Sequence, residues 1–157
     1  MKHKIKIIKD TIFKDSRGLI WTSWNKEKLK LNFKHDKFAL SKKYVLRGFH
    51  GDEKTWKLMS CVYGKILLVI VNYDKKSKDY LKFKKINLDH KVNKTVLIPP
   101  RYINATYCKS EYCLLHYKLS YQGKYNDVKN QISVKWNDNR FKFKWPNTKK
   151  ILSKRDK

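Results

Sequence analysis

Apolar and polar residues alternate along much of this chain with the period of two that extended strands show. Residues 28–34 (KLKLNFK) and 140–145 (RFKFKW) keep the alternation strictly, which predicts two strands with one buried face each. Residues 66–71 (ILLVIV) are apolar without interruption, which is typical of a strand buried on both faces. Shorter runs predict further strands at residues 4–8, 19–24, 44–50, 55–64, 80–88, 94–98, 112–121 and 131–136.

Turn-forming residues separate these segments. Asp15–Gly18 (DSRG) and Trp136–Asn139 (WNDN) carry side chains that close turns through local hydrogen bonds. Pro99 and Pro100 end the strand before them, because proline cannot donate a hydrogen bond to a ladder. The chain is also poor in alanine, the best helix former. Many short strands with such punctuation predict an all-β fold, a sandwich or a barrel.

Length and composition predict one domain. A chain of 157 residues with 41% hydrophobic residues can bury a core, and we expect a single domain over residues 1–157. No apolar run is long enough to span a bilayer, and residues 1–10 lack the apolar segment of a signal peptide. We therefore expect a cytoplasmic protein without a membrane partner. Residues 149–157 form a basic end, but Ile151 and Leu152 within it predict that it docks on the domain.

The charge balance narrows the class of partner. Lysine and arginine number 39 against 13 aspartates and glutamates, a formal net charge of +26 that attracts anions, nucleic acid among them. Only five of the basic residues are arginines, and the lysines are spread along the whole chain. Nucleic-acid readers usually concentrate charge on one face and favour arginine for base contacts. The pattern therefore favours an anionic small substrate, such as a nucleotide diphosphate, over nucleic acid.

The three cysteines, Cys61, Cys108 and Cys113, are an odd number without the spacing of metal ligands. Neither a disulfide framework nor a zinc site fits them. We expect reduced, space-filling thiols.

His50 and Lys57 are the first candidates for chemistry. His50 follows a predicted strand and precedes a Gly-Asp turn, where a histidine can act as a base, although a solvated loop histidine is more common. Lys57 comes seven residues later, and a hairpin would return it close to His50. A cation there can stabilise an oxyanion, whereas on so basic a chain an ordinary surface lysine is the simpler interpretation.

Two tyrosines and an aspartate complete the set. Tyr117 alternates with Leu115 and Leu119, so the three share a face, and Tyr121 extends that face if the strand continues. An inward tyrosine can donate a proton, but more often it fills a core. Asp156 is nearly terminal, where an acid is normally solvated. It would contribute to chemistry only if the C-terminal segment folded back to orient a histidine.

Together these residues resemble the dTDP-4-dehydrorhamnose 3,5-epimerase family, nucleotide-sugar epimerases with the cupin fold, a β jelly roll. The matching segments keep the family's order over nearly the whole chain: DSRGLIW at Asp15, VLRGFH at Val45, WKLMSCVYG at Trp56, VNYDKKSKDY at Val71, LIPP at Leu97, HYKLSY at His116, WND at Trp136, FKWP at Phe143 and LSKRD at Leu152.

More narrowly, the chain resembles the branch that acts on GDP-4-keto-6-deoxy-heptoses in bacterial capsule biosynthesis. The segments that indicate this branch are FKHDKF at Phe33, RGFHGDEKTWKL at Arg47, CVYG at Cys61, IPPRYINATY at Ile98 and YKLSYQGKYND at Tyr117.

The resemblance implies the catalytic roles. His50 would remove the proton next to the 4-keto group, and Asp156 would hold and polarise it. Lys57 would stabilise the enolate oxygen. Tyr117 would return a proton from the opposite face, with Tyr121 as the weaker candidate. These residue types suit the reaction, because a proton beside a ketone is only weakly acidic and its removal needs both a base and an oxyanion stabiliser.

The resemblance also implies the binding residues. Arg47 and Arg17 would contact the nucleotide diphosphate, with Arg17 reaching a neighbouring subunit of a homodimer. His35 and Lys37 would lie near the substrate. No metal or redox cofactor is required.

Asn104 departs from the family pattern, because the rhamnose enzymes carry a histidine at the matching position. Asparagine can hydrogen-bond but cannot exchange a proton near neutral pH. The capsular-heptose branch resembles this chain in having the asparagine, so we do not expect lost activity. Inversion at C3 alone, or at both C3 and C5, remains open at this point.

Three other functions compete with the GDP-heptose epimerase. The first is an epimerase or isomerase for a dTDP-4-keto-6-deoxyhexose. The second is a non-catalytic basic jelly roll that binds a polyanion, whose binding would weaken steeply with salt. The third is a sugar-binding cupin without chemistry, which would need no set such as His50, Asp156, Lys57 and Tyr117.

Overall fold

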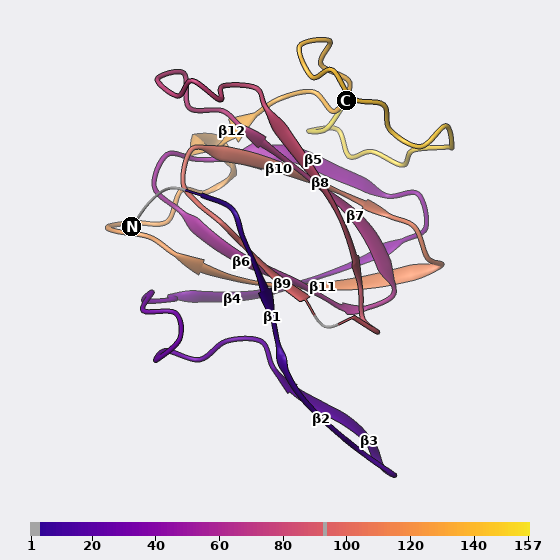
Figure 1. Ribbon diagram of the computed structural model, residues 1–157. Helices are drawn as coiled ribbons and strands as arrows, with labels where there is room; N and C mark the ends of the chain where they lie inside the picture. The colour runs from indigo at the N-terminus through magenta and orange to yellow at the C-terminus, as the bar shows by residue number, and fades with distance from the viewer. Residues whose placement is uncertain (1–3, 93) are drawn as a thin grey trace.

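The computed structural model describes residues 4–92 and 94–157 and forms two β-sheets packed face to face (Figure 1). One sheet has the strand order β1-β9-β6-β11-β4, and the other has the order β12-β5-β10-β7-β8. The strands of the first sheet are β1 (Lys6–Lys9), β9 (Lys94–Ile98), β6 (Trp56–Tyr63), β11 (Tyr112–Ser120) and β4 (His35–Lys42). Those of the second are β12 (Ile132–Ser133), β5 (Leu46–Gly51), β10 (Tyr102–Cys108), β7 (Lys65–Asn72) and β8 (Phe83–Asp89).

A hairpin of β2 (Thr11–Asp15) and β3 (Gly18–Thr22) projects from this sandwich as a separate two-stranded sheet (Figure 1). One 3₁₀ turn, Val128–Asn130, is the helical element of the described residues. The prediction of an all-β fold is confirmed. Within residues 4–92 and 94–157, no helix has the length and apolar character needed to span a membrane.

Strand β7 explains how the core is divided. Its alternate residues Ile66, Leu68 and Ile70 point between the two sheets and pack in the interior cluster. The intervening residues, Leu67 and Val69 among them, belong to a second cluster on the outer side of the same sheet. Both faces of the strand are therefore covered, which is why its sequence is apolar throughout, as predicted.

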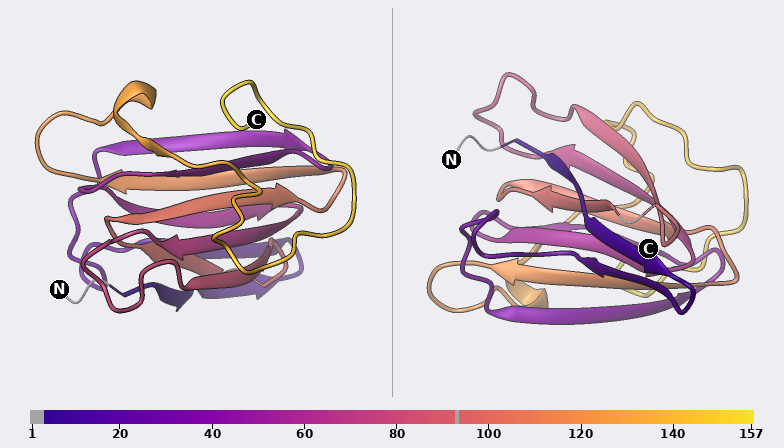
Figure 2. Two further views of the ribbon diagram at one scale, coloured as in Figure 1. Left: turned by 90° about the horizontal axis from the view of Figure 1, so that it is seen from above. Right: turned by 60° about the horizontal axis from the view of Figure 1, so that its bottom comes forward.

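Two segments that were wrongly predicted as strands cover the outer faces of the sheets. Residues 28–34 and 140–145 were predicted as strands, but neither forms one. In the first, Leu29, Leu31 and Phe33 pack on the outer face of the β6 and β9 sheet. In the second, Phe141, Phe143 and Trp145 join the cluster outside β7, and this segment crosses the sheet in Figure 2. The alternation correctly predicted one buried side, but these segments lie across a sheet face and do not pair with a neighbouring strand.

The sequence pattern did not predict three of the strands, β2, β4 and β10. Strands β2 and β4 lie at edges or outside the sandwich, where most of their residues are exposed and apolar alternation carries little information. Strand β10 (YINATYC) mixes small and polar residues because it faces the candidate site described below. The predicted turns at residues 15–18 and 136–139 do contain local side-chain hydrogen bonds. Asp15 Oδ1 accepts a hydrogen bond from the Arg17 backbone N, and Asp138 Oδ1 accepts one from the Arg140 backbone N.

The C-terminal segment docks on the sandwich, as its apolar pair predicted. Ile151 forms a parallel bridge with Val45 beside β5. The three cysteines are buried and form no disulfides. Burial raises the pKa of the Cys61 thiol to about 12, so this residue behaves as a space-filling thiol, as expected.

Strand β5 approaches β10 so closely that Gly48 has no room for a side chain. A Cβ built there would lie 2.5 Å from the backbone O of Asn104 and 2.7 Å from Cα of Ala105. Gly48 also has φ +121°, a conformation that residues with side chains rarely adopt. The glycine thus sets the path of the strand that carries His50.

We predict that Gly48→Ala lowers the free energy of unfolding by about 3 kcal/mol or more, because it adds backbone strain and a clash with β10. Gly123→Ala is the matched control: Gly123 also has positive φ, but nothing lies within 4 Å of its Cβ position. The control should cost about 1 kcal/mol. Urea denaturation of both variants measures the difference, and equal losses would contradict the close-approach argument.

Candidate active site

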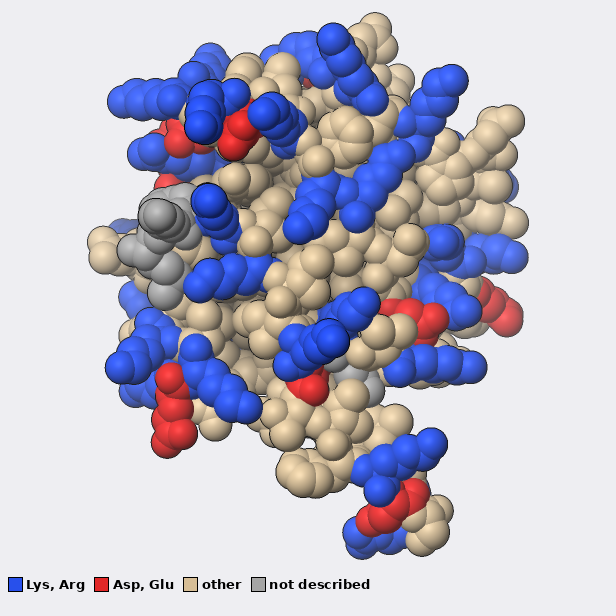
Figure 3. All heavy atoms as spheres, viewed as in Figure 1, with Lys and Arg blue, Asp and Glu red and all other residues tan. Residues whose placement is uncertain are grey.

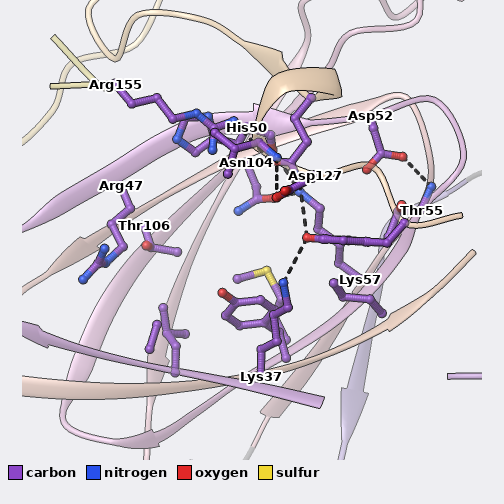
Figure 4. Close-up of a pocket in the computed structure, with 18 of the residues that line it drawn as sticks. Lys37, Arg47, His50, Asp52, Thr55, Lys57, Asn104, Thr106, Asp127 and Arg155 are labelled. Carbon is purple, nitrogen blue, oxygen red and sulfur yellow. Dashed lines mark hydrogen bonds between the residues drawn. The ribbon is translucent and has the colours of Figure 1, made fainter. Parts of the chain in front are cut away.

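A cavity of about 370 Å³ opens between the two sheets at one end of the sandwich (Figure 4). One wall comes from β5 and β10 and carries His50 and Asn104. The facing wall comes from β4, β6 and β11 and carries Lys37, Lys57 and Tyr117. Polar and charged residues line the cavity together with Leu115 and Leu119, whereas the rest of the interior between the sheets is apolar.

His50 and Asp156 form a hydrogen-bonded pair on the first wall. Nε2 of His50 lies 2.7 Å from Oδ1 of Asp156, whose carboxylate is 5% exposed. The backbone N of Gly48 donates to Oδ1, and the Ser153 hydroxyl donates to Oδ2. Burial alone would raise the pKa of Asp156, but the bonds from His50, Ser153 and Gly48 outweigh it and hold the pKa below its usual value. The carboxylate therefore stays ionised and can orient the imidazole.

Lys57 stands at the floor of the cavity. Its Nζ donates to the backbone O of His50 at 2.9 Å and to Oδ1 of Asn104 at 2.8 Å. An ammonium has three N–H bonds, so one is left to point at a ligand. Desolvation lowers the pKa of Lys57 to about 8, with the Asp52 charge opposing that shift and the Arg155 charge adding to it. A proton-bearing cation of this kind suits an oxyanion.

Tyr117 and Asn104 lie on opposite walls. Tyr117 pairs with Met59 and Lys37 across the β6 and β4 ladders, and it packs beside the interior cluster. Asn104 is directly opposite His50 in the β10 and β5 pair. Leu115 and Leu119, which the alternation placed on the face of Tyr117, also line the cavity. The strand pairing thus places a phenol across the cavity from the imidazole.

Two basic residues line the cavity nearer its rim. Arg47 donates through Nε to the Ser41 hydroxyl and through Nη2 to the Leu40 backbone O. Lys37 Nζ lies 4.3 Å from the centre of the Tyr125 ring and donates to its hydroxyl at 3.2 Å. Both cations are oriented by protein groups while still facing the cavity, which favours an anionic ligand.

The remaining predicted residues lie farther out. His35 and Tyr121 contact each other, and the His35 ring centre lies 4.8 Å from that of Tyr125, so they stand behind the cavity lining. Strand β11 ends at Ser120, so the condition under which Tyr121 would share the face of Tyr117 is not met. Arg17 sits on the projecting hairpin, paired with Asp15, and does not line this cavity.

Several lining residues were not anticipated from the sequence. They come from the β5–β6 turn and from the two C-terminal segments: Asp52, Thr55, Tyr125, Asp127, Val128, Gln131, Ser153 and Arg155. Ser153 and Arg155 stand beside Asp156 in the LSKRD segment, so the docking of that segment was a usable signal. The rest lie in loops whose path no periodicity predicts.

Nothing in the described chain forms a metal centre: residues 4–92 and 94–157 contain no group of three or more His, Cys, Asp or Glu side chains placed to hold an ion. Among the charged lining residues, the cations Lys37, Arg47, Lys57 and Arg155 outnumber the carboxylates Asp52, Asp127 and Asp156, which favours an anionic ligand.

Comparison with known proteins gives a consistent result. The family model described as dTDP-4-dehydrorhamnose 3,5-epimerase matches residues 3–157. Among curated relatives, the dTDP-4-dehydrorhamnose 3,5-epimerase of Salmonella typhimurium is 29% identical over 149 residues, which cover 89% of this chain and 80% of the relative. The enzyme of the same name from Escherichia coli is 27% identical over 160 residues, covering 96% and 85%.

Solved structures agree with the sequence relatives. The dTDP-4-dehydrorhamnose 3,5-epimerase of Bacillus anthracis, solved with TDP and pyrophosphate bound, superposes with a TM-score of 0.90 at 25% identity, covering 97% of this chain and 90% of that one. The Legionella pneumophila 3,5-epimerase, solved with dTDP-4-keto-L-rhamnose, gives a TM-score of 0.89 at 26% identity, covering 97% and 84%. These neighbours confirm the cupin jelly-roll prediction.

The lowered pKa of Lys57 predicts a pH dependence of stability. Between pH 8 and 10.5 the native state has released the Lys57 proton while the unfolded chain retains it, so stability rises with pH. We expect the wild type to gain up to about 3 kcal/mol over Lys57→Gln across this window, as measured by urea denaturation at several pH values. Below pH 8 the difference should be flat. A difference that falls with rising pH would contradict the desolvated lysine.

Proposed function

The chain belongs to the dTDP-4-dehydrorhamnose 3,5-epimerase family, and from that premise we propose that it inverts C3, or C3 and C5, of a nucleotide-diphosphate 4-keto-6-deoxy sugar. Membership makes it a nucleotide-sugar epimerase. The observation that carries the residue roles is the placement of His50 and Tyr117 on facing walls of one cavity, with Lys57 at its floor.

Inversion requires a base and an acid on opposite faces of the sugar ring. His50 takes the proton from the carbon beside the ketone, and the C–H electron pair moves to the keto oxygen as an enolate. Lys57 stabilises that oxygen through its remaining N–H bond, a contribution of about 10²- to 10³-fold for one such donor. Tyr117 then returns a proton from the other wall, and the ketone reforms. Asp156 keeps the imidazole oriented throughout.

The cations around the cavity suit the diphosphate. Arg47 and Lys37 line the cavity and can meet the diphosphate. Basic side chains are also distributed over the face shown in Figure 3, with few acidic ones among them and no single concentrated patch. The distribution supports attraction of an anionic small molecule. His35 and Tyr121 contribute by supporting Tyr125, which lines the cavity.

Two nucleotide sugars are candidate substrates. The resemblance within the GDP-heptose branch favours a GDP-4-keto-6-deoxy-heptose, an intermediate for capsule polysaccharide. The similar proteins are dTDP-sugar epimerases, which favours a dTDP-4-keto-6-deoxyhexose instead. Asn104 accepts a hydrogen bond from Lys57 and lies opposite His50. It stands where the rhamnose enzymes carry a histidine, and unlike a histidine it cannot exchange a proton near neutral pH. That difference makes inversion at C3 alone a candidate outcome, beside inversion at both C3 and C5.

Solvent exchange tests both the chemistry and the substrate. We predict that the protein in D₂O exchanges the C3 proton of GDP-4-keto-6-deoxy-manno-heptose, followed by proton NMR, and that His50→Asn abolishes the exchange. Additional exchange at C5 identifies a 3,5-epimerase. A parallel incubation with a dTDP-4-keto-6-deoxyhexose separates the two substrates, and the absence of exchange with both would contradict the proposal.

We further propose that the enzyme is a homodimer. Every residue of β2 is exposed, and Phe13 and Ile20 of the hairpin are 67% and 69% exposed. An isolated two-stranded hairpin is only marginally stable in water, so this arm needs a surface to cover it. The outer face of edge strand β4 offers one, with Phe38 and Leu40 each 63% exposed. A second copy would place Arg17, at the tip of the arm, against the neighbouring subunit.

We predict a solution mass of twice the 19.0 kDa chain mass, measured by light scattering on a sizing column. The double substitution Phe13→Asp, Ile20→Asp should give a folded monomer, because two charges cannot be buried unpaired in an apolar contact. Ile151→Asp, at a residue 42% exposed that bridges to Val45 beside β5 of the other sheet, is the control and should remain dimeric. A monomeric wild type would rule the dimer out.

A further inference from the structure

Both ring nitrogens of His50 contact protein groups. Nε2 faces Asp156, and Nδ1 lies 3.2 Å from the hydroxyl oxygen of Ser133. Ser133 is the residue directly opposite His50 where β12 pairs with β5, so the backbone ladder sets this contact. The two partners come from different C-terminal segments, and each acts on a different nitrogen.

Arg155 determines which way the Ser133 proton points. Its Nε and Nη2 donate to the Ser133 hydroxyl oxygen at 3.1 and 2.9 Å. The Oε1 atom of Gln131 accepts a further bond from Nη2 at 3.1 Å, which fixes the guanidinium. A hydroxyl can accept two hydrogen bonds and donate one. Because Arg155 fills both acceptor positions, the Ser133 proton is left to donate to Nδ1 of His50.

The two ends of the imidazole therefore require the same tautomer. The ionised Asp156 carboxylate can only accept, so Nε2 carries the ring proton. Ser133, committed as a donor, requires a lone pair on Nδ1. This is the neutral form that a general base needs, with its proton-accepting nitrogen already defined.

We propose that Ser133 and Arg155 are positioning residues that hold His50 in the neutral tautomer with the lone pair on Nδ1. The inference rests on the proposed function, in which His50 is the base. When the substrate carbon approaches, its C–H bond replaces the Ser133 hydroxyl at Nδ1. The new Nδ1–H bond then forms as the C–H bond breaks and its electron pair moves to the keto oxygen.

A purely structural role is the competing explanation, since Arg155 and Ser133 also tie the C-terminal segment to β12. The tautomer of His50 distinguishes the two explanations. If Ser133 and Arg155 only attach the C-terminal segment to β12, either ring nitrogen of His50 can carry the proton. Long-range ¹H–¹⁵N correlation spectra of the protein labelled at histidine show it directly, without any substrate. The His50 signals are identified by their loss in His50→Asn.

We expect the wild-type spectrum to show a protonated Nε2 and an unprotonated Nδ1. In Ser133→Ala the Nδ1 resonance should move to the position of a nitrogen that accepts no hydrogen bond, and Ser133→Thr should restore the wild-type value. A protonated Nδ1 in the wild type, or an unchanged Nδ1 resonance in Ser133→Ala, would overturn the proposal. This readout is independent of whether either nucleotide sugar is turned over.

Kinetics of C3 exchange supply the second readout, with whichever of the GDP-heptose and dTDP-hexose substrates the enzyme accepts. Ser133→Ala should lower kcat about 3- to 10-fold with KM unchanged, the effect of one lost hydrogen bond. Arg155→Gln should lower kcat similarly, and the double variant should lose little more, because the two act through one contact. Arg140→Gln, which breaks an exposed pair with Asp138, is the control. A rise in KM alone would assign the pair to binding and reject positioning.

Discussion

The hydrogen bond between His50 and Asp156 joins residues 106 positions apart, and much of the fold serves to make it. Asp156 reaches the imidazole only because the preceding segment crosses the outer face of the β7 sheet. Aromatic residues from 141 to 145 fill that face, and the bridge from Ile151 to Val45 brings the chain back beside β5. The same packing that completes the hydrophobic core therefore brings the Asp156 carboxylate to His50.

The two sheets carry the polar groups of the site on opposing walls of the cavity. Strands β5 and β10 hold the imidazole and Asn104, and strands β4, β6 and β11 hold the cations and the phenol. The spacing between the sheets is fixed by the apolar interior below the cavity, so the core sets the separation of the His50 imidazole from the Tyr117 phenol. Lys57 links the walls, because it rises from β6 and bonds to His50 and Asn104.

The sequence predicted the fold class and the central residues, and its failures have physical causes. Alternation reports that one side of a segment is buried, but it cannot say whether the segment pairs in a ladder or lies across a sheet, and residues 28–34 and 140–145 were misassigned for that reason. His50, Lys57 and Tyr117 stood out because their strands were recognisable. Ser133 and Tyr125 did not, because their place depends on loops and on a two-residue strand. Arg17 was expected to contact the nucleotide diphosphate by reaching a neighbouring subunit, and within one chain it does not line the cavity.

The strands that form the two walls of the cavity are spread along the chain, which has a consequence for when the cavity is complete. Residues of the site come from β4, β5, β6, β10, β11 and the C-terminal segment, so the chain passes back and forth between sheets before the site is whole. The shortest continuous segment that contains both walls and the carboxylate runs from Lys37 to Asp156, which is most of the chain. Pairings between such distant strands form late and slowly, because loop closure must precede them. The cavity is therefore complete only when both sheets and the C-terminal segment have packed together.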